Sequence, residues 1–75
     1  MKISDLQDKT IINITTGKEI GRISDLEINN EGVVVNFYAM KKRSVLNFFE
    51  TNEEIIFKTN NIKKIGEDVI LVEID

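Results

Sequence analysis

The chain has 75 residues, of which 41% are hydrophobic, so it has material for one small core and is too short for two domains. Ten basic and thirteen acidic side chains give a formal net charge of −3, a balance that disfavours general nucleic-acid binding, in which phosphate neutralisation dominates the affinity. Cysteine and histidine are both absent, which excludes disulfides, the usual zinc sites and Cys–His or Ser–His–Asp catalysis.

The N-terminal residues 1–6 carry neither the apolar run nor the small-residue cleavage site of a signal peptide. Elsewhere, the apolar runs are far shorter than the roughly 20 residues that span a bilayer. We therefore expect a single cytoplasmic domain over residues 1–75, with no membrane insertion. Ser4 is a candidate cap for a short helical turn, from which Ile3 and Leu6 would plug one end of the fold.

Apolar residues recur at short period over most of the chain, which predicts strands. Residues 10–15 form a first strand, with Ile12 and Ile14 on one face and the polar residues on the other. A turn follows at residues 16–19, where Gly17 accepts a positive φ without steric cost.

Residues 20–28 form a second strand whose apolar pattern slips once. Ile23 is out of phase with the other aliphatic residues, and one extra residue near Ser24 and Asp25 restores the phase. This slip predicts a β-bulge and a sharp bend. We expect Asp25 to accept hydrogen bonds from backbone N–H groups that the bulge frees, a structural role, with a functional carboxylate as the less favoured alternative.

Residues 29–32, which end in Gly32, are typical of a hairpin turn between two apolar strands. The third strand, residues 33–40, is apolar on both faces apart from Asn36. A strand of this composition is central or covered by another surface. Its two faces are predicted to be Val33, Val35, Phe37 and Ala39 on one side and Val34, Tyr38 and Met40 on the other.

The longest irregular stretch is residues 41–52, within which Phe48 and Phe49 are predicted to fold down over one mouth of the barrel. Residues 53–58 form a fourth strand, in which alternation places Ile55 and Phe57 inward and Ile56 partly outward.

Residues 60–66 begin either with a helical turn, capped by Asn60 or Asn61 and stopped near Gly66, or with a short strand. The last strand covers residues 69–74, with three aliphatic residues in phase. Five to six short strands with tight turns predict an all-β fold. We expect a small antiparallel β-barrel, closed or nearly closed, with one or two short helical turns, because closure removes exposed strand edges.

One cluster of basic residues, residues 41–43, is a candidate binding surface, which Lys58, Lys63 and Lys64 would join in space. Residues 41–43 lie close in sequence to three aromatic residues, Tyr38, Phe48 and Phe49, a combination that fits single-stranded RNA as well as a protein partner. The simplest interpretation is a solvated loop whose phenylalanines belong to the core, and we favour it. The candidate partner-binding residues are Lys41, Lys42, Arg43, Phe48, Phe49, Lys63 and Lys64.

The motif Gly21-Arg22-Ile23-Ser24-Asp25, which lies within residues 13–28, resembles the opening of a PRC-barrel domain. Residues 61–72 resemble the closing segment of that family, and residues 2–6 resemble its start. Together they resemble most the single-domain YlmC/YmxH group of spore-forming bacteria. The resemblance implies a small antiparallel barrel and a non-catalytic role. We expect structural roles for Gly17, Gly21, Asp25, Gly32 and Gly66.

The leading functional hypothesis is an adaptor whose exposed strand edges and loop of residues 41–52 bind a protein partner, with a link to sporulation. Another copy of the chain is one candidate partner. It rests on the doubly apolar strand of residues 33–40, which a lone barrel would struggle to cover. The alternative is an RNA- or ribosome-associated module that uses the basic cluster. We expect neither enzymatic activity nor a cofactor, because the chain offers few groups that could carry chemistry.

Overall fold

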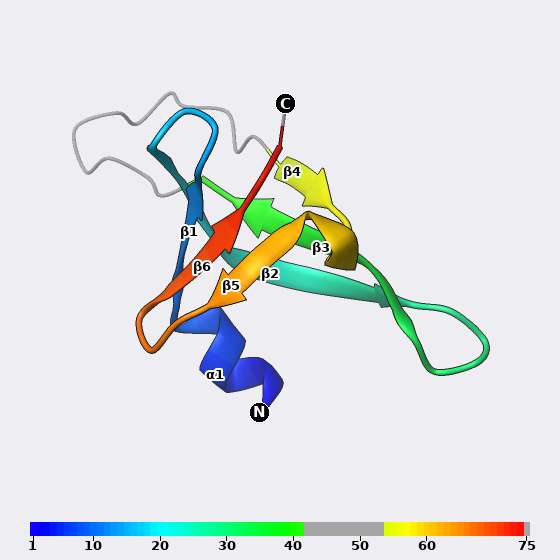
Figure 1. Ribbon diagram of the computed structural model, residues 1–75. Helices are drawn as coiled ribbons and strands as arrows, with labels where there is room; N and C mark the ends of the chain where they lie inside the picture. Colours follow the sequence, from blue (N-terminus) through cyan, green and yellow to red (C-terminus); the bar gives the residue numbers. More distant parts are fainter. Residues whose placement is uncertain (42–53, 75) are drawn as a thin grey trace, which may run out of the picture.

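The computed structural model describes residues 1–41 and 54–74. These residues form a mostly-β fold with two short helical turns (Figure 1), as predicted. In chain order the elements are α1 (Ile3–Gln7), β1 (Thr10–Asn13), β2 (Lys18–Ile28), β3 (Val34–Met40), β4 (Glu54–Phe57), the 3₁₀ turn η1 (Thr59–Asn61), β5 (Ile62–Ile65) and β6 (Val69–Val72).

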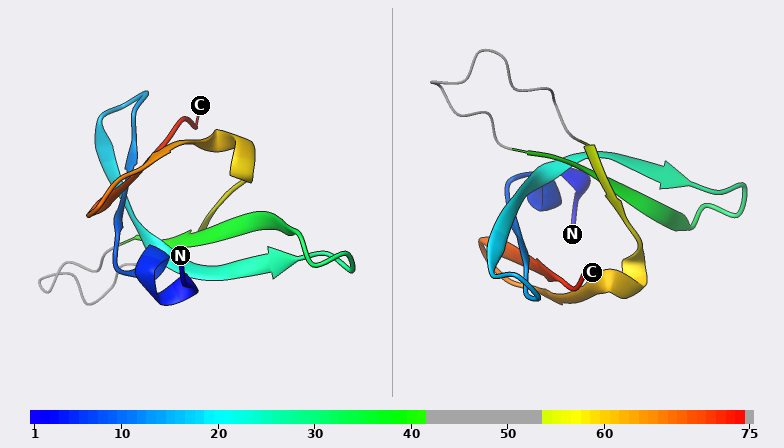
Figure 2. Two further views of the ribbon diagram at one scale, coloured as in Figure 1. Left: turned by 60° about the horizontal axis from the view of Figure 1, so that its bottom comes forward. Right: turned by 90° about the horizontal axis from the view of Figure 1, so that it is seen from above.

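The strands pair in the order β4-β3-β2-β1-β6-β5, and the sheet curls into a ring (Figure 2). Four of the pairings are antiparallel, as predicted, whereas β1 and β6 run parallel. The two edge strands, β4 and β5, are consecutive in the chain and are joined by η1. At this corner the chain itself, rather than a ladder of strand pairs, completes the ring.

Strand β2 contains the predicted bulge. Its register with β3 passes from Ile23↔Ala39 to Asp25↔Tyr38 and leaves Ser24 as the extra residue. A second bulge at Ile20 was not predicted: the register with β1 passes from Glu19 to Gly21 across the adjacent pair Ile12–Ile11. Because each bulge reverses the alternation, the inward-facing side chains of β2 are Ile20, Ile23 and Leu26, and the pattern slips twice rather than once.

Gly21 lies where β2 stops pairing with β1 and starts pairing with β3. Its φ is +141°, and a Cβ atom built there would lie 2.0 Å from the carbonyl oxygen of Met40. Backbone of β3 therefore occupies the space that any side chain at residue 21 would need.

A third bulge, at Val35, changes the faces of β3. The register passes from Glu27↔Asn36 to Ile28↔Val34, and Val34 packs against the core. The predicted grouping of Val34 with Tyr38 and Met40 is therefore wrong. The hairpin itself forms as predicted: Asn29 Oδ1 accepts hydrogen bonds from the N–H groups of Glu31 (2.9 Å) and Val33 (3.0 Å).

Helix α1 begins after Lys2, whose N–H donates to Asp5 Oδ2 at 2.8 Å, so the predicted cap at Ser4 is wrong. Leu6 packs against the core, as expected. Ile3 is 53% exposed, so the prediction that it closes one end of the fold is wrong. Among the described residues, no helix combines the length and apolar composition needed to cross a membrane.

Five of the six strands supply the buried hydrophobic side chains of the core, and Ile62 on β5 packs against it from the sixth. The rings of Phe37 and Phe57 stack with their centroids 5.3 Å apart. Ile56 is 55% exposed, so β4 alternates as predicted. The segment after β4 contains both predicted elements: a helical turn at Thr59–Asn61 and then a strand at Ile62–Ile65. The cap of the turn is Lys58, so the predicted cap at Asn60 or Asn61 is wrong. The buried hydrophobic residues are Ile11, Ile20, Ile23, Phe37, Ala39, Phe57, Ile70 and Val72.

Replacing Gly21 by alanine should destabilise the fold by about 3 kcal/mol or more, because the positive φ and the contact with the Met40 carbonyl both oppose a Cβ atom. Urea denaturation measures the change. The control is Gly17→Asn: φ at Gly17 is +71°, and a Cβ atom there would have no neighbour within 4 Å, so this change should cost about 1 kcal/mol or less. Equal losses in the two variants would contradict this account of Gly21.

Candidate functional site

The β2–β3 hairpin extends beyond the ring of strands (Figures 1 and 2). We call its outer part, residues 27–35, the hairpin arm. Ile28 and Val33 lie on this arm and are 55% and 54% exposed. Residues 23–40 contain three acidic residues, Asp25, Glu27 and Glu31, and neither lysine nor arginine. The arm is therefore an apolar element whose own charges are all negative.

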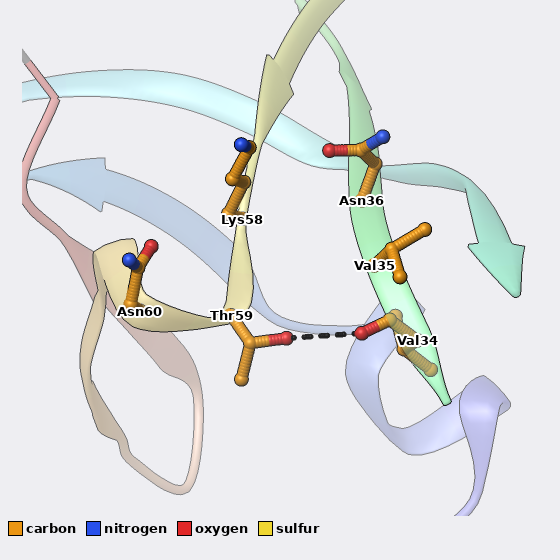
Figure 3. Close-up of a pocket in the computed structure, with 6 residues that line it drawn as sticks. All are labelled: Val34, Val35, Asn36, Lys58, Thr59 and Asn60. Atoms are coloured by element: carbon orange, nitrogen blue, oxygen red, sulfur yellow. Dashed lines mark hydrogen bonds between the residues drawn. The ribbon is translucent and has the colours of Figure 1, made fainter. Parts of the chain in front are cut away.

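A pocket of about 420 Å³ lies at the base of the arm (Figure 3). It forms because the pairing of β3 with β4 ends at Phe37↔Phe57, after which the chain diverges into η1. A side-chain hydrogen bond continues the contact, from Thr59 Oγ1 to the carbonyl oxygen of Val34 (3.4 Å). The β3 wall of the pocket combines two valines with an asparagine, and the opposite wall is polar. The lining residues are Val34, Val35, Asn36, Lys58, Thr59 and Asn60.

Tyr38 lies among carboxylates on the outer face of β2, β3 and β4, the face that points away from the core. Glu27 Oε1 accepts hydrogen bonds from Asn36 Nδ2 (2.5 Å) and from the Tyr38 hydroxyl (3.5 Å). Asp25 is the register partner of Tyr38 on β2. Partial burial, together with the negative charges of Glu27, Glu54 and Asp25, raises the pKa of the Tyr38 phenol above its ordinary value of 10.0.

The predicted basic cluster is only partly within the described residues. Lys42, Arg43, Phe48 and Phe49 lie outside them. Lys41 follows the end of β3 that pairs with the start of β4. Lys63 and Lys64 lie on β5, which follows η1, and η1 adjoins the opposite end of β3. The structure therefore does not bring Lys41 beside Lys63 and Lys64.

Lys63 and Lys64 occupy an edge strand, and this position suggests a protective role. Lys63 is the extra residue of a bulge in the β5–β6 register, and its Nζ lies 3.9 Å from Glu73 Oε2. Lysines and bulges on an edge strand discourage pairing with strands of other molecules. These two residues therefore have a structural interpretation beside the binding one.

The residues with expected structural roles occupy turns and bulges. Gly17 and Gly32 have φ of +71° and +82° in the β1–β2 and β2–β3 turns. Gly66 donates its N–H to the Val69 carbonyl oxygen at 2.7 Å. Asp25 is exposed rather than enclosed, and its Oδ1 accepts one backbone N–H bond, from Leu26 at 2.8 Å.

Two buried polar residues were missed from the sequence. Lys9 and Asn13, each 9% exposed, share the inward face of β1 with Ile11. Lys9 Nζ donates to the carbonyl oxygens of Gly66 (2.7 Å) and Glu67 (2.5 Å). Asn13 bonds both the N–H and the carbonyl oxygen of Ile74. Residues 9, 11 and 13 alternate along the chain, and this spacing is the signal that could have revealed the two buried polar residues. The predicted apolar face of Ile12 and Ile14 is wrong for Ile14, which is 46% exposed.

Within residues 1–41 and 54–74, no three acidic side chains come close enough to hold a metal ion together. The features that stand out are a projecting apolar arm, a pocket at its base and an acidic outer face.

Residues 1–75 match the PRC-barrel domain family over the full length of the chain. The chain belongs to this family. It is 40% identical to the probable sporulation protein YlmC of Bacillus subtilis (strain 168) over 75 residues, which cover 99% of this chain and 93% of that relative. It is 34% identical over 73 residues to an uncharacterized protein of Clostridium acetobutylicum, covering 97% and 84% of the two chains. The resemblance seen in the sequence is confirmed.

Replacing Lys9 by methionine should destabilise this PRC-barrel domain by about 2–3 kcal/mol, because the carbonyl groups of Gly66 and Glu67 lose charge-assisted hydrogen bonds in a buried place. Chemical denaturation measures the loss. The matched control is Lys18→Met on the exposed start of β2, which should change the stability by less than about 0.5 kcal/mol. If the two variants were equally stable, Lys9 would not be the link between β1 and the β5–β6 turn.

Tyr38 is the only tyrosine of this PRC-barrel domain, so its phenolate absorbance can be followed directly. The titration midpoint should be higher in the folded protein than in urea, and Glu27→Gln should lower it. Folding raises the pKa of Tyr38, so the protonated phenol stabilises the folded state relative to the phenolate. This contribution to stability is complete at pH values below the pKa of the unfolded chain and is lost as the pH rises through the pKa of the folded chain. The same midpoint in folded and unfolded chains would refute the negative field at Tyr38.

Proposed function

We propose that this PRC-barrel domain is a non-catalytic protein-interaction module that binds its partner through the hairpin arm. The single observation that carries the proposal is the exposure of Ile28 and Val33 on an element that projects from the barrel. Exposed aliphatic side chains next to a pocket gain free energy when a partner removes them from water. Neither residue is buried in the fold, so both are available to that partner.

The biological setting of the proposal is sporulation. The relative from Bacillus subtilis carries a probable sporulation role in its name, and the two chains align over nearly their whole lengths. We place this domain in the cytoplasm of a spore-forming cell, where it would act as an adaptor. Its partner would be a protein that presents an apolar surface to the arm.

An RNA-binding role has less support among the described residues. The arm and the adjoining outer face carry acidic side chains, which oppose a phosphate backbone. Of the predicted basic residues, Lys41 lies apart from Lys63 and Lys64. Titration with a short single-stranded RNA, followed by NMR, separates the two roles, and the adaptor proposal predicts no shifts at these three lysines.

The double variant Ile28→Asp/Val33→Asp should reduce capture of protein partners from the organism's own lysate by about tenfold or more, because two apolar contacts are replaced by charges. Capture is quantified against the unaltered chain, in growing and in sporulating cells. The control is Ile14→Asp, which alters an exposed isoleucine in the β1–β2 turn, away from the arm.

Thermal unfolding shows whether each variant keeps its fold, which is expected because all three residues are exposed. Undiminished capture by the folded double variant would contradict the proposal. So would an equal loss in Ile14→Asp, since it would indicate unspecific adhesion of apolar residues.

A further inference from the structure

The outer face of β2, β3 and β4 adjoins the hairpin arm and has no covering element among the described residues. Register places Ile56, Tyr38 and Asp25 in one row across the three strands. Ile56 is 55% exposed and Tyr38 is half-buried. The row thus begins with an aliphatic side chain, continues with an aromatic ring and ends with a carboxylate.

Two further carboxylates stand beside this row. Glu27 is the register partner of Asn36, and Glu54 is the register partner of Met40. Both are diagonal neighbours of the central tyrosine, and diagonal neighbours on a sheet lie about 7–8 Å apart. Glu27 is held in place by Asn36 and Tyr38, as described above, so its carboxylate is already ordered.

One cation has the same relation to Tyr38 as Glu54 has. Arg22 is the register partner of Met40 on β2, and Lys58 follows the end of β4. Three carboxylates, Glu27, Glu54 and Asp25, surround the phenol, and their charges add to burial, the larger cause, in raising its pKa. The centre of the face therefore has a net negative field around a half-buried aromatic ring.

We propose that this face binds a basic segment of a different protein, with an arginine or lysine over Tyr38 and an aliphatic side chain over Ile56. The inference rests on the proposed protein-binding role and names the chemistry of the partner. Arginine suits the position best, because guanidinium stacks on aromatic rings and also pairs with carboxylates. A second copy of the chain is disfavoured, since the two identical faces would bring like charges together.

The spacing of the strands sets the spacing of the partner's residues. Neighbouring strands lie about 4.8 Å apart, and an extended chain advances about 3.3 Å per residue. Ile56 is therefore about 4.8 Å from Tyr38 and about 9.6 Å from Asp25 across the strands. Residues i and i+2 of an extended segment lie on one face about 6.6 Å apart, which falls between these two distances. The expected motif is Ile, Leu or Val, then any residue, then Arg or Lys.

The test is selection from an unbiased peptide-display library with the full chain as target. Enriched peptides should carry the aliphatic–x–basic motif, and NMR shifts of the labelled chain should centre on Tyr38 and Ile56. Glu27→Gln should weaken the selected peptide about threefold to fivefold, and added salt should weaken it further. The control Glu19→Gln makes the same charge change on the part of β2 that pairs with β1, and should leave the affinity unchanged.

Enrichment of acidic or uncharged peptides would overturn the inference, as would equal effects of Glu27→Gln and Glu19→Gln. Failure to enrich any peptide would also overturn it. After any of these outcomes, the proposed protein-binding function is judged separately by the variant Ile28→Asp/Val33→Asp. That function stands if the variant loses capture of a folded partner, and it falls if the variant captures the partner normally. If the chain instead associated with itself, and Glu27→Gln weakened that association, the inference of a different, basic partner would be wrong, and the occupant of the face would be a second copy of the chain.

Discussion

The bend in β2 is the constraint on which the rest of the structure depends. This strand pairs with β1 through its first residues and with β3 through the remainder, so it belongs to both halves of the ring. Bulges at Ile20 and Ser24 bend the strand. Gly21, which has no side chain, allows the backbone of β3 at Met40 to contact the backbone of β2. Eleven residues of extended chain span about 36 Å, more than a ring of short strands needs. The excess continues past the barrel as the hairpin arm.

Hydrogen bonds from polar side chains connect parts of the chain that strand pairing does not join. Lys9 links the start of β1 to the β5–β6 turn, and Asn13 links its end to Ile74. Asn61, in η1, donates to the carbonyl oxygen of Glu73 at 3.0 Å and accepts the N–H of Lys58 at 2.9 Å. A small domain buries a limited apolar area, so satisfied polar contacts of this kind contribute an appreciable part of its stability. The arm contributes little to this network, which leaves its side chains available for a partner.

Local alternation predicted the strands, the hairpin and the bulge at Ser24, because each of these changes the apolar pattern within a few residues. The bulge at Val35 left no such trace, since three consecutive valines look alike in either phase. Burial of Lys9 depends on carbonyl groups 57 and 58 residues away, and the parallel pairing of β1 with β6 is equally non-local. The acidic face was not predicted for the same reason, because its residues come from three different strands. The basic cluster was predicted because its residues are neighbours in sequence.

We propose that the projecting arm and the outer face beside it form the docking surface of this PRC-barrel domain. Amide hydrogen exchange of the chain, alone and in the complex with its captured partner, tests this most directly. We predict that protection on binding concentrates in residues 25–38, with β5 and β6 unchanged. Protection confined to residues 62–72, with the arm exchanging as it does in the free chain, would contradict the account.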